Sequence, residues 1–98
     1  MKKIALKFTY YTDLITVPDS VFQDIYKIRQ KFDKWLYDKS NDHGNWIIKN
    51  GRKVAVSFDA ETFIDYLNDF CLNDSNEKAL IVEENATEIP AKVPTIFF

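Results

Sequence analysis

The stretch NWIIKNGRKVAVSF, residues 45–58, contains the clearest structural signal in this chain of 98 residues. Two runs of alternating apolar residues flank the dipeptide Asn50-Gly51, which tolerates the positive φ angles of a two-residue type I′ turn. The stretch therefore predicts a β-hairpin. Basic residues surround the turn in KNGRK, residues 49–53, and the turn is either a solvated hairpin tip or a contact with a ligand.

Helical periodicity appears on both sides of this hairpin. Before it, Pro18 disfavours helical geometry at the preceding residue, and Asp19 or Ser20 can cap a helix over residues 20–39. Apolar residues recur there at spacings of three and four and should form a buried stripe: Val21, Ile25, Ile28, Phe32, Trp35 and Leu36. After the hairpin, Asp59 can cap a second helix. Its expected buried stripe consists of Phe63, Ile64, Leu67, Phe70 and Cys71.

Strand patterns occur near both ends of the chain. Residues 3–11 alternate apolar and polar side chains, which predicts a half-buried first strand. The run KALIVEE, residues 78–84, is a short apolar segment that fits a fourth strand. The alternative is a short third helix capped by Asp74, with Glu77 three residues later. Periodicity does not separate the two in so short a run, and we favour the strand.

With a strand at residues 78–84, the order of elements is β-α-β-β-α-β. This order is typical of a ferredoxin-like, two-layer sandwich, so the expected fold is a single α+β domain over residues 1–88. Residues 89–98 are expected to be an extended apolar tail, because two prolines disfavour regular structure there. The terminal Ile-Phe-Phe either docks on its own domain or binds in a groove of a partner.

The composition is typical of one small domain from a reducing compartment. Apolar residues make up 46% of the chain and aromatic residues 15%, and a chain this short has room for one core. Cys71 is the only cysteine, so no internal disulfide can form. The opening MKK resembles the start of a signal peptide, but Lys7 and Asp13 interrupt the apolar run that follows. We therefore expect a cytoplasmic protein. The bias toward Lys, Asn and Ile suggests a low-GC bacterium.

No residues form a recognisable catalytic, cofactor or metal site. His43 is the sole histidine and lies in a polar stretch without a nucleophile motif, while Cys71 is expected on a buried stripe. Gly44 and Gly51 are both expected in turns, so no glycine-rich phosphate loop remains. A metal site needs more converging oxygen ligands than one helix face supplies. The sequence therefore predicts a non-enzymatic protein without a cofactor.

Charge is distributed unevenly along the chain. Residues 1–53 contain eleven Lys or Arg and six Asp or Glu, a net of +5, whereas residues 54–98 contain two against nine, a net of −7. Such asymmetry indicates an interaction surface. Three acidic residues recur at four-residue intervals and so share one face of the second helix: Glu61, Asp65 and Asp69. We expect a solvated face whose charge attracts a basic partner.

Two kinds of binding follow from these patterns. The first is protein binding, to another protein or to a second copy of the chain. Aromatic side chains dominate interface energetics, so the expected anchors are those beside the first helix's stripe: Phe22, Tyr26 and Tyr37. The alternative is nucleic-acid binding through a basic patch on the first helix and the hairpin. That patch would comprise Lys27, Lys31, Lys34, Lys49, Arg52 and Lys53.

Residues 25–69 carry a family resemblance. The segment IYKIRQKFDKWLYDKSNDHGNWIIKNGRKVAVSFDAETFIDYLND, with KFDKWLYDK and IDYLN as its most typical parts, resembles small accessory proteins of mobile elements. These proteins are carried on conjugative elements, plasmids and phages of low-GC Gram-positive bacteria, and some small proteins of that setting are anti-CRISPR inhibitors. The resemblance implies an accessory or inhibitory role and assigns no role to a single residue.

Overall fold

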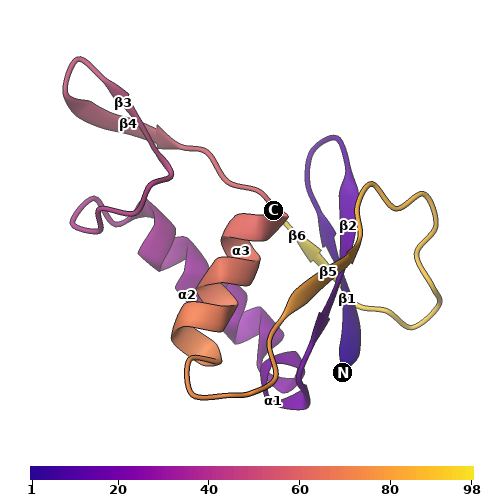
Figure 1. The fold of residues 1–98 in the computed structure, drawn as a ribbon. Coiled ribbons are helices and arrows are strands. Elements are labelled where there is room, and N and C mark those ends of the chain that lie inside the picture. The colour runs from indigo at the N-terminus through magenta and orange to yellow at the C-terminus, as the bar shows by residue number, and fades with distance from the viewer.

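The chain forms two separate β-sheets, and only one of them belongs to the body of the molecule. The computed structural model describes residues 1–98. Its strands are β1 (Lys2–Lys7), β2 (Thr12–Val17), β3 (Trp46–Lys49), β4 (Arg52–Val56), β5 (Leu80–Glu83) and β6 (Thr95–Phe97). A four-stranded sheet has the order β5-β2-β1-β6, and the β3-β4 hairpin stands apart from it (Figure 1).

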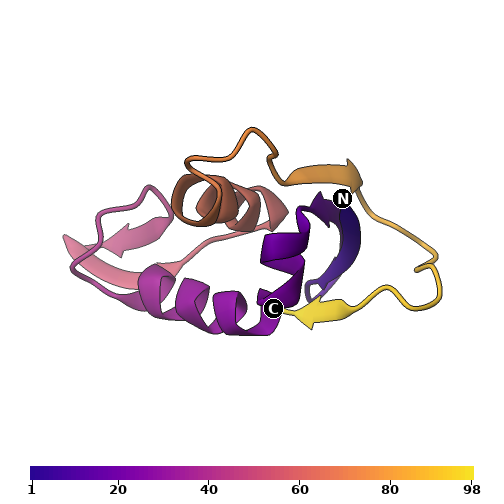
Figure 2. The ribbon, with the colours of Figure 1, turned by 90° about the horizontal axis from the view of Figure 1, so that it is seen from below.

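The helices lie on the side of the sheet away from the 84–94 loop (Figure 2). They are α1 (Asp19–Gln23), α2 (Ile25–Tyr37), α3 (Ala60–Tyr66) and the π-helical continuation η1 (Leu67–Cys71). Phe32 of α2 is fully buried, and its ring meets those of Phe63 and Tyr66 edge-on at centroid distances of 5.0 and 5.2 Å. The same buried cluster contains Ile4, Leu6 and Ile15 of the sheet, so helices and sheet share one core.

Strand β2 was not expected from the sequence. Residues 12–17 precede the first helix and pair antiparallel with β1, from Lys2 opposite Val17 to Lys7 opposite Thr12. The strand is hard to recognise from the sequence because it contains Asp13, and a buried carboxylate is atypical of a β-strand. The structure accommodates this carboxylate through a hydrogen bond, which it accepts from the backbone N–H of Asn85 at 2.9 Å.

The α+β class is confirmed, but the ferredoxin-like arrangement is not. Strand β2 precedes the first helix, and β5 and β6 flank the β1-β2 pair in the main sheet. The predicted β3-β4 hairpin takes no part in that sheet. The hairpin itself forms as predicted, with positive φ angles of 54° at Asn50 and 74° at Gly51. Its apolar side chains remain exposed, at 47% for Ile47, 58% for Ile48 and 55% for Val54.

The first predicted helix is divided at Asp24. Its start also differs from the prediction, since neither Asp19 nor Ser20 caps it. Pro18 occupies the cap position without a side-chain hydrogen bond, and its carbonyl accepts from the Val21 amide at 3.1 Å. The predicted stripe is buried except for the half-buried Trp35. Even α2, the longest helix at 13 residues, lacks the length and hydropathy of a membrane-spanning segment.

The second predicted helix begins as expected and ends differently. Asp59 and Thr62 form a capping box, and the first members of the predicted stripe are buried: Phe63, Ile64 and Leu67. Phe70 and Cys71 were also expected in the stripe, but both are exposed. The reason is the π-helical turn, in which the Leu72 amide bonds to a carbonyl five residues earlier and residues advance through a smaller angle.

The C-terminal part of the chain completes the four-stranded sheet. Residues 80–83 are a strand, so the alternative of a helix starting at Asp74 is wrong. The apolar tail docks on its own domain, where β6 runs parallel to β1 and the Phe98 amide donates to the Lys7 carbonyl at 2.9 Å. Ile96 is buried, and the Phe98 ring stacks on Phe8 at 4.8 Å.

Candidate protein-binding site

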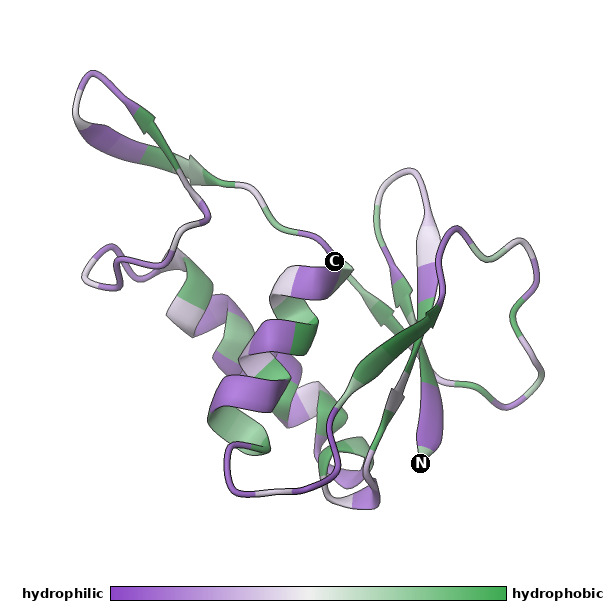
Figure 3. Ribbon diagram, in the orientation of Figure 1, coloured by the Kyte–Doolittle hydropathy of each residue, from purple (hydrophilic) through white to green (hydrophobic).

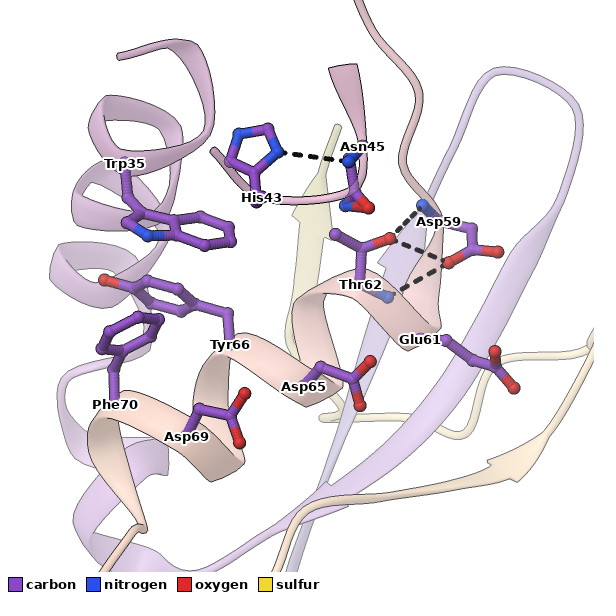
Figure 4. A pocket seen from close by; sticks show the side chains of 10 residues that line it. All are labelled: Trp35, His43, Asn45, Asp59, Glu61, Thr62, Asp65, Tyr66, Asp69 and Phe70. Carbon is purple, nitrogen blue, oxygen red and sulfur yellow. Dashed lines mark hydrogen bonds between the residues drawn. The ribbon is translucent and has the colours of Figure 1, made fainter. Parts of the chain in front are cut away.

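A pocket of about 340 Å³ opens between α2, the loop before β3, and the α3-η1 helix (Figure 4). Its lining combines acidic and aromatic side chains: Trp35, His43, Asn45, Asp59, Glu61, Thr62, Asp65, Tyr66, Asp69 and Phe70. The three acidic residues that share a helix face by sequence therefore lie beside aromatic residues from two helices. This combination makes the pocket the candidate binding site.

The acidic side of the pocket is a row of four carboxylates, here called the acidic row: Asp59, Glu61, Asp65 and Asp69. All four residues are exposed. The two ion pairs of the structure, Arg29–Asp33 and Lys53–Asp42, involve none of them. No group of three or more His, Cys, Asp or Glu side chains is arranged to hold a metal ion. The row thus presents negative charge that no cation of the chain neutralises by direct contact.

The opposite side of the pocket is an aromatic wall formed by Trp35, Tyr66 and Phe70. The ring centroids lie 5.2 Å apart for Trp35 and Tyr66, 5.5 Å for Trp35 and Phe70, and 5.0 Å for Tyr66 and Phe70. Desolvation raises the pKa of the Tyr66 hydroxyl, and the nearby Cys71 adds to this effect, so the phenol stays neutral. Phe70 is 57% exposed and offers apolar surface to a ligand.

His43 joins the pocket to the base of the hairpin. Its Nε2 donates to the Leu36 carbonyl at 2.7 Å, and its Nδ1 accepts from the Asn45 amide at 3.3 Å. The ring lies 4.8 Å from that of Trp35 and stacks on Trp46 at 5.1 Å. Both ring nitrogens therefore have partners, and the side chain, expected in a polar loop, is half-buried and links two elements.

Lys53 fastens the hairpin to the loop that follows α2. Its Nζ donates to the Lys39 carbonyl at 2.5 Å and to the Asp42 carboxylate at 2.6 Å. This hydrogen bond, and then the charge of Lys53, lower the pKa of Asp42. Trp46 adds a second tie, since its indole N–H donates to the Asn41 carbonyl at 2.7 Å. Because Trp46 begins β3 and Lys53 lies in β4 directly after Arg52, both strands of the hairpin are tied to the loop that follows α2.

The three predicted aromatic anchors lie outside the pocket and are spread along α1 and α2. Tyr26 and Tyr37 are exposed on α2, 63% and 57% respectively, but they stand about 16 Å apart along the helix axis. Phe22 of α1 is half-buried against the core, with the Lys2 ammonium 5.9 Å from its ring centroid. The structure brings together the acidic residues of the prediction, but not these aromatic ones.

The predicted basic residues are divided between α2 and the hairpin. Lys27, Lys31 and Lys34 are exposed along α2, while Lys49 and Arg52 are exposed beside the hairpin turn. The sixth, Lys53, is engaged within the chain as described above. Five of the six residues are therefore free to meet a ligand.

Sequence reasoning did not identify the aromatic wall. Trp35 and Phe70 were both assigned to buried stripes, and Tyr66 was not singled out. The signal was present in the spacing, because Tyr66 and Phe70 are four positions apart in the same helical segment as Asp65 and Asp69. The contribution of Trp35, however, depends on how α2 packs against α3.

Comparison with known proteins adds no family assignment. No protein family, characterised protein or solved structure gives a significant match to the chain.

Proposed function

We propose that this chain is a non-enzymatic protein-binding module whose acidic pocket holds a basic side chain of a partner protein. The observation that carries the proposal is one pocket lined by both the acidic row and the aromatic wall, with no cation of the chain paired to the row. An arginine guanidinium stacks on aromatic rings and donates two parallel hydrogen bonds to a carboxylate, so it suits both sides of the pocket. Tyr26, Tyr37 and Phe22 are proposed as further contacts outside it.

The resemblance of residues 25–69 to accessory proteins of mobile elements supports a more specific role. We propose that the module acts in the bacterial cytoplasm as an accessory protein or inhibitor, with a host protein that handles nucleic acids as its target. Such proteins present basic surfaces to nucleic acid, and an acidic pocket is electrostatically complementary to a surface of this kind. Anti-CRISPR inhibitors are one example of this class.

A comparative capture experiment tests the proposal. Tagged wild-type chain and a variant carrying Asp65→Asn and Asp69→Asn are used to capture proteins from a nuclease-treated lysate of a low-GC Gram-positive bacterium. We expect one protein to bind the wild type specifically and to be lost from the variant. A matched control, Glu83→Gln with Glu84→Gln, removes the same charge outside the pocket and should retain the partner. Equal capture by both variants would contradict the proposal.

The alternative is nucleic-acid binding, which the exposure of Lys49 and Arg52 on a hairpin outside the main sheet favours. It predicts that nuclease treatment removes the captured material, that binding falls steeply with salt, and that Lys49→Ala with Arg52→Ala weakens it. Lys53 contributes to this alternative only if it gives up its contacts with Lys39 and Asp42.

A further inference from the structure

The β3-β4 hairpin, here called the arm, lacks the packing that normally stabilises two strands. Figure 3 shows apolar strands leading to a polar tip, well clear of the sheet and the helices. An isolated two-stranded hairpin is only marginally stable in water, and three large apolar side chains of this one are about half exposed: Ile47, Ile48 and Val54. The arm thus exposes apolar side chains, although Trp46 and Lys53 tie it to the loop after α2.

One face of the arm carries an ordered pattern of side chains. The register pairs Ile47 with Ala55 and Lys49 with Arg52, with a β-bulge at Val54 between the two pairs. These side chains point to the same face, whereas Ile48 points to the other. The other face of the arm carries Trp46 and Lys53, whose side chains are tied to the loop after α2. From base to tip the face of Ile47 and Lys49 therefore changes from apolar to basic, over a length of about 13 Å for the four residues of β3.

The acidic row continues this pattern at the base of the arm. Asn45, Asp59 and Thr62 line the acidic pocket and also a second hollow, which reaches the first arm residues, Trp46 and Ile47. From Asp59 to Asp69 the row extends about 15 Å along the α3-η1 helix. Acidic, apolar and basic side chains thus follow one another from the α3-η1 helix, through the base of the arm, to its tip.

We infer that two copies of this chain associate through their arms, with the basic tip of each arm at the acidic row of the other. A sequence of acidic, apolar and basic segments is self-complementary when two copies lie antiparallel about a two-fold axis. The apolar middles then cover each other, and each tip places Lys49 and Arg52 at the partner's carboxylates. This assignment names a second copy as a partner of the acidic pocket and so rests on the proposed binding of basic side chains there.

Charge reversal at the two ends of this contact provides a test. One variant carries Lys49→Glu and Arg52→Glu at the tip, and the other carries Glu61→Lys, Asp65→Lys and Asp69→Lys in the acidic row. Light scattering after size-exclusion chromatography, under reducing conditions because Cys71 is exposed, measures the molar mass. We expect a concentration-dependent dimer for the wild type and monomers for each variant alone. An equimolar mixture of the two variants should restore the dimer, since both tip-to-row contacts are attractive again.

Controls separate this inference from the proposed function. Lys27→Glu with Lys34→Glu makes the same charge change as the tip variant, but on α2, and should leave the dimer intact, and circular dichroism confirms that each variant is folded. At roughly 1 M salt, where the screening length is about 3 Å, the dimer should weaken. A wild type that stays monomeric at every concentration, or a mixture of variants that does not dimerise, would overturn the inference. Lysate capture that still depends on Asp65 and Asp69 would then leave the proposed function in place.

Discussion

At the scale of single residues, Asp59 combines a structural and a chemical role. Its carboxylate accepts hydrogen bonds from the Thr62 amide and hydroxyl, each at 3.1 Å, and it also belongs to the acidic row. We expect Asp59→Ala to lower the free energy of unfolding by about 1 kcal/mol, because the helix cap is lost. Asp59→Asn should retain most of this stability while removing the charge. Urea denaturation of both variants checks the prediction, and equal losses would contradict it.

The ion pair of Lys53 with Asp42 predicts a dependence on pH. Lys53 lowers the pKa of Asp42 below its ordinary value of 3.8. A carboxyl group with a lowered pKa in the folded state stabilises the fold above its unfolded pKa, and this contribution is lost as pH falls through the lowered value. It is small, because Asp42 is exposed. The difference in urea midpoint between wild type and Asp42→Asn should therefore be present at neutral pH and vanish in acid. A difference independent of pH would contradict this account.

At the scale of elements, the hairpin turn depends on Gly51. Its φ angle of 74° lies in the left-handed region, whereas the φ angle of Gly44 does not. A Cβ added at either glycine would meet no other atom within 4 Å. We expect Gly51→Ala to destabilise the arm by about 1 kcal/mol through backbone strain alone. Hydrogen exchange of the β3 and β4 amides should accelerate, while exchange in β1 and β2 stays unchanged. Gly44→Ala is the matched control and should leave the arm amides as they are.

Some of these elements are readable from the sequence because local chemistry determines them. Asn50-Gly51 tolerates the positive φ angles that a two-residue turn between strands requires, and Asp59 with Thr62 forms its cap from atoms three residues apart. Strand β2 depends instead on pairing with β1, and its buried Asp13 is acceptable only because the distant Asn85 donates to it. The π-helical turn after Tyr66 likewise changes which side chains face the core, and no local pattern revealed it.

At the scale of the whole molecule, Phe32 connects the helices, the sheet and the C-terminal tail. Its ring lies within 6.1 Å, centroid to centroid, of those of Phe58, Phe63 and Phe98. Phe32→Ala should cost about 3–5 kcal/mol, a large share of the roughly 5–15 kcal/mol that stabilises a small domain. Phe97, which is 66% exposed, is the control, and Phe97→Ala should stay within about 0.5 kcal/mol. A thermal unfolding midpoint that Phe32→Ala leaves unchanged would refute a single shared core.

The candidate site could be predicted only in part, because it is assembled across elements. The four-residue spacing of Glu61, Asp65 and Asp69 correctly placed them on one face of a helix. That this face borders an aromatic wall depends on the packing of α2 against α3, which brings Trp35 to Tyr66, and on the π-helical turn that exposes Phe70. Long-range packing of this kind leaves no local pattern in the sequence.

The measurement that most directly tests the central claim is an NMR titration of the pocket with a defined cationic probe. A short arginine-containing peptide is compared with the same peptide carrying citrulline, which has nearly the same shape but no charge. We predict chemical-shift changes at the Trp35 indole and at the Asp65 and Asp69 amides with the arginine peptide alone. Each removed carboxylate should weaken binding by up to about fivefold, as for exposed ion pairs. Equal shifts with both peptides, or shifts confined to residues outside the pocket, would contradict the claim that this site binds basic side chains.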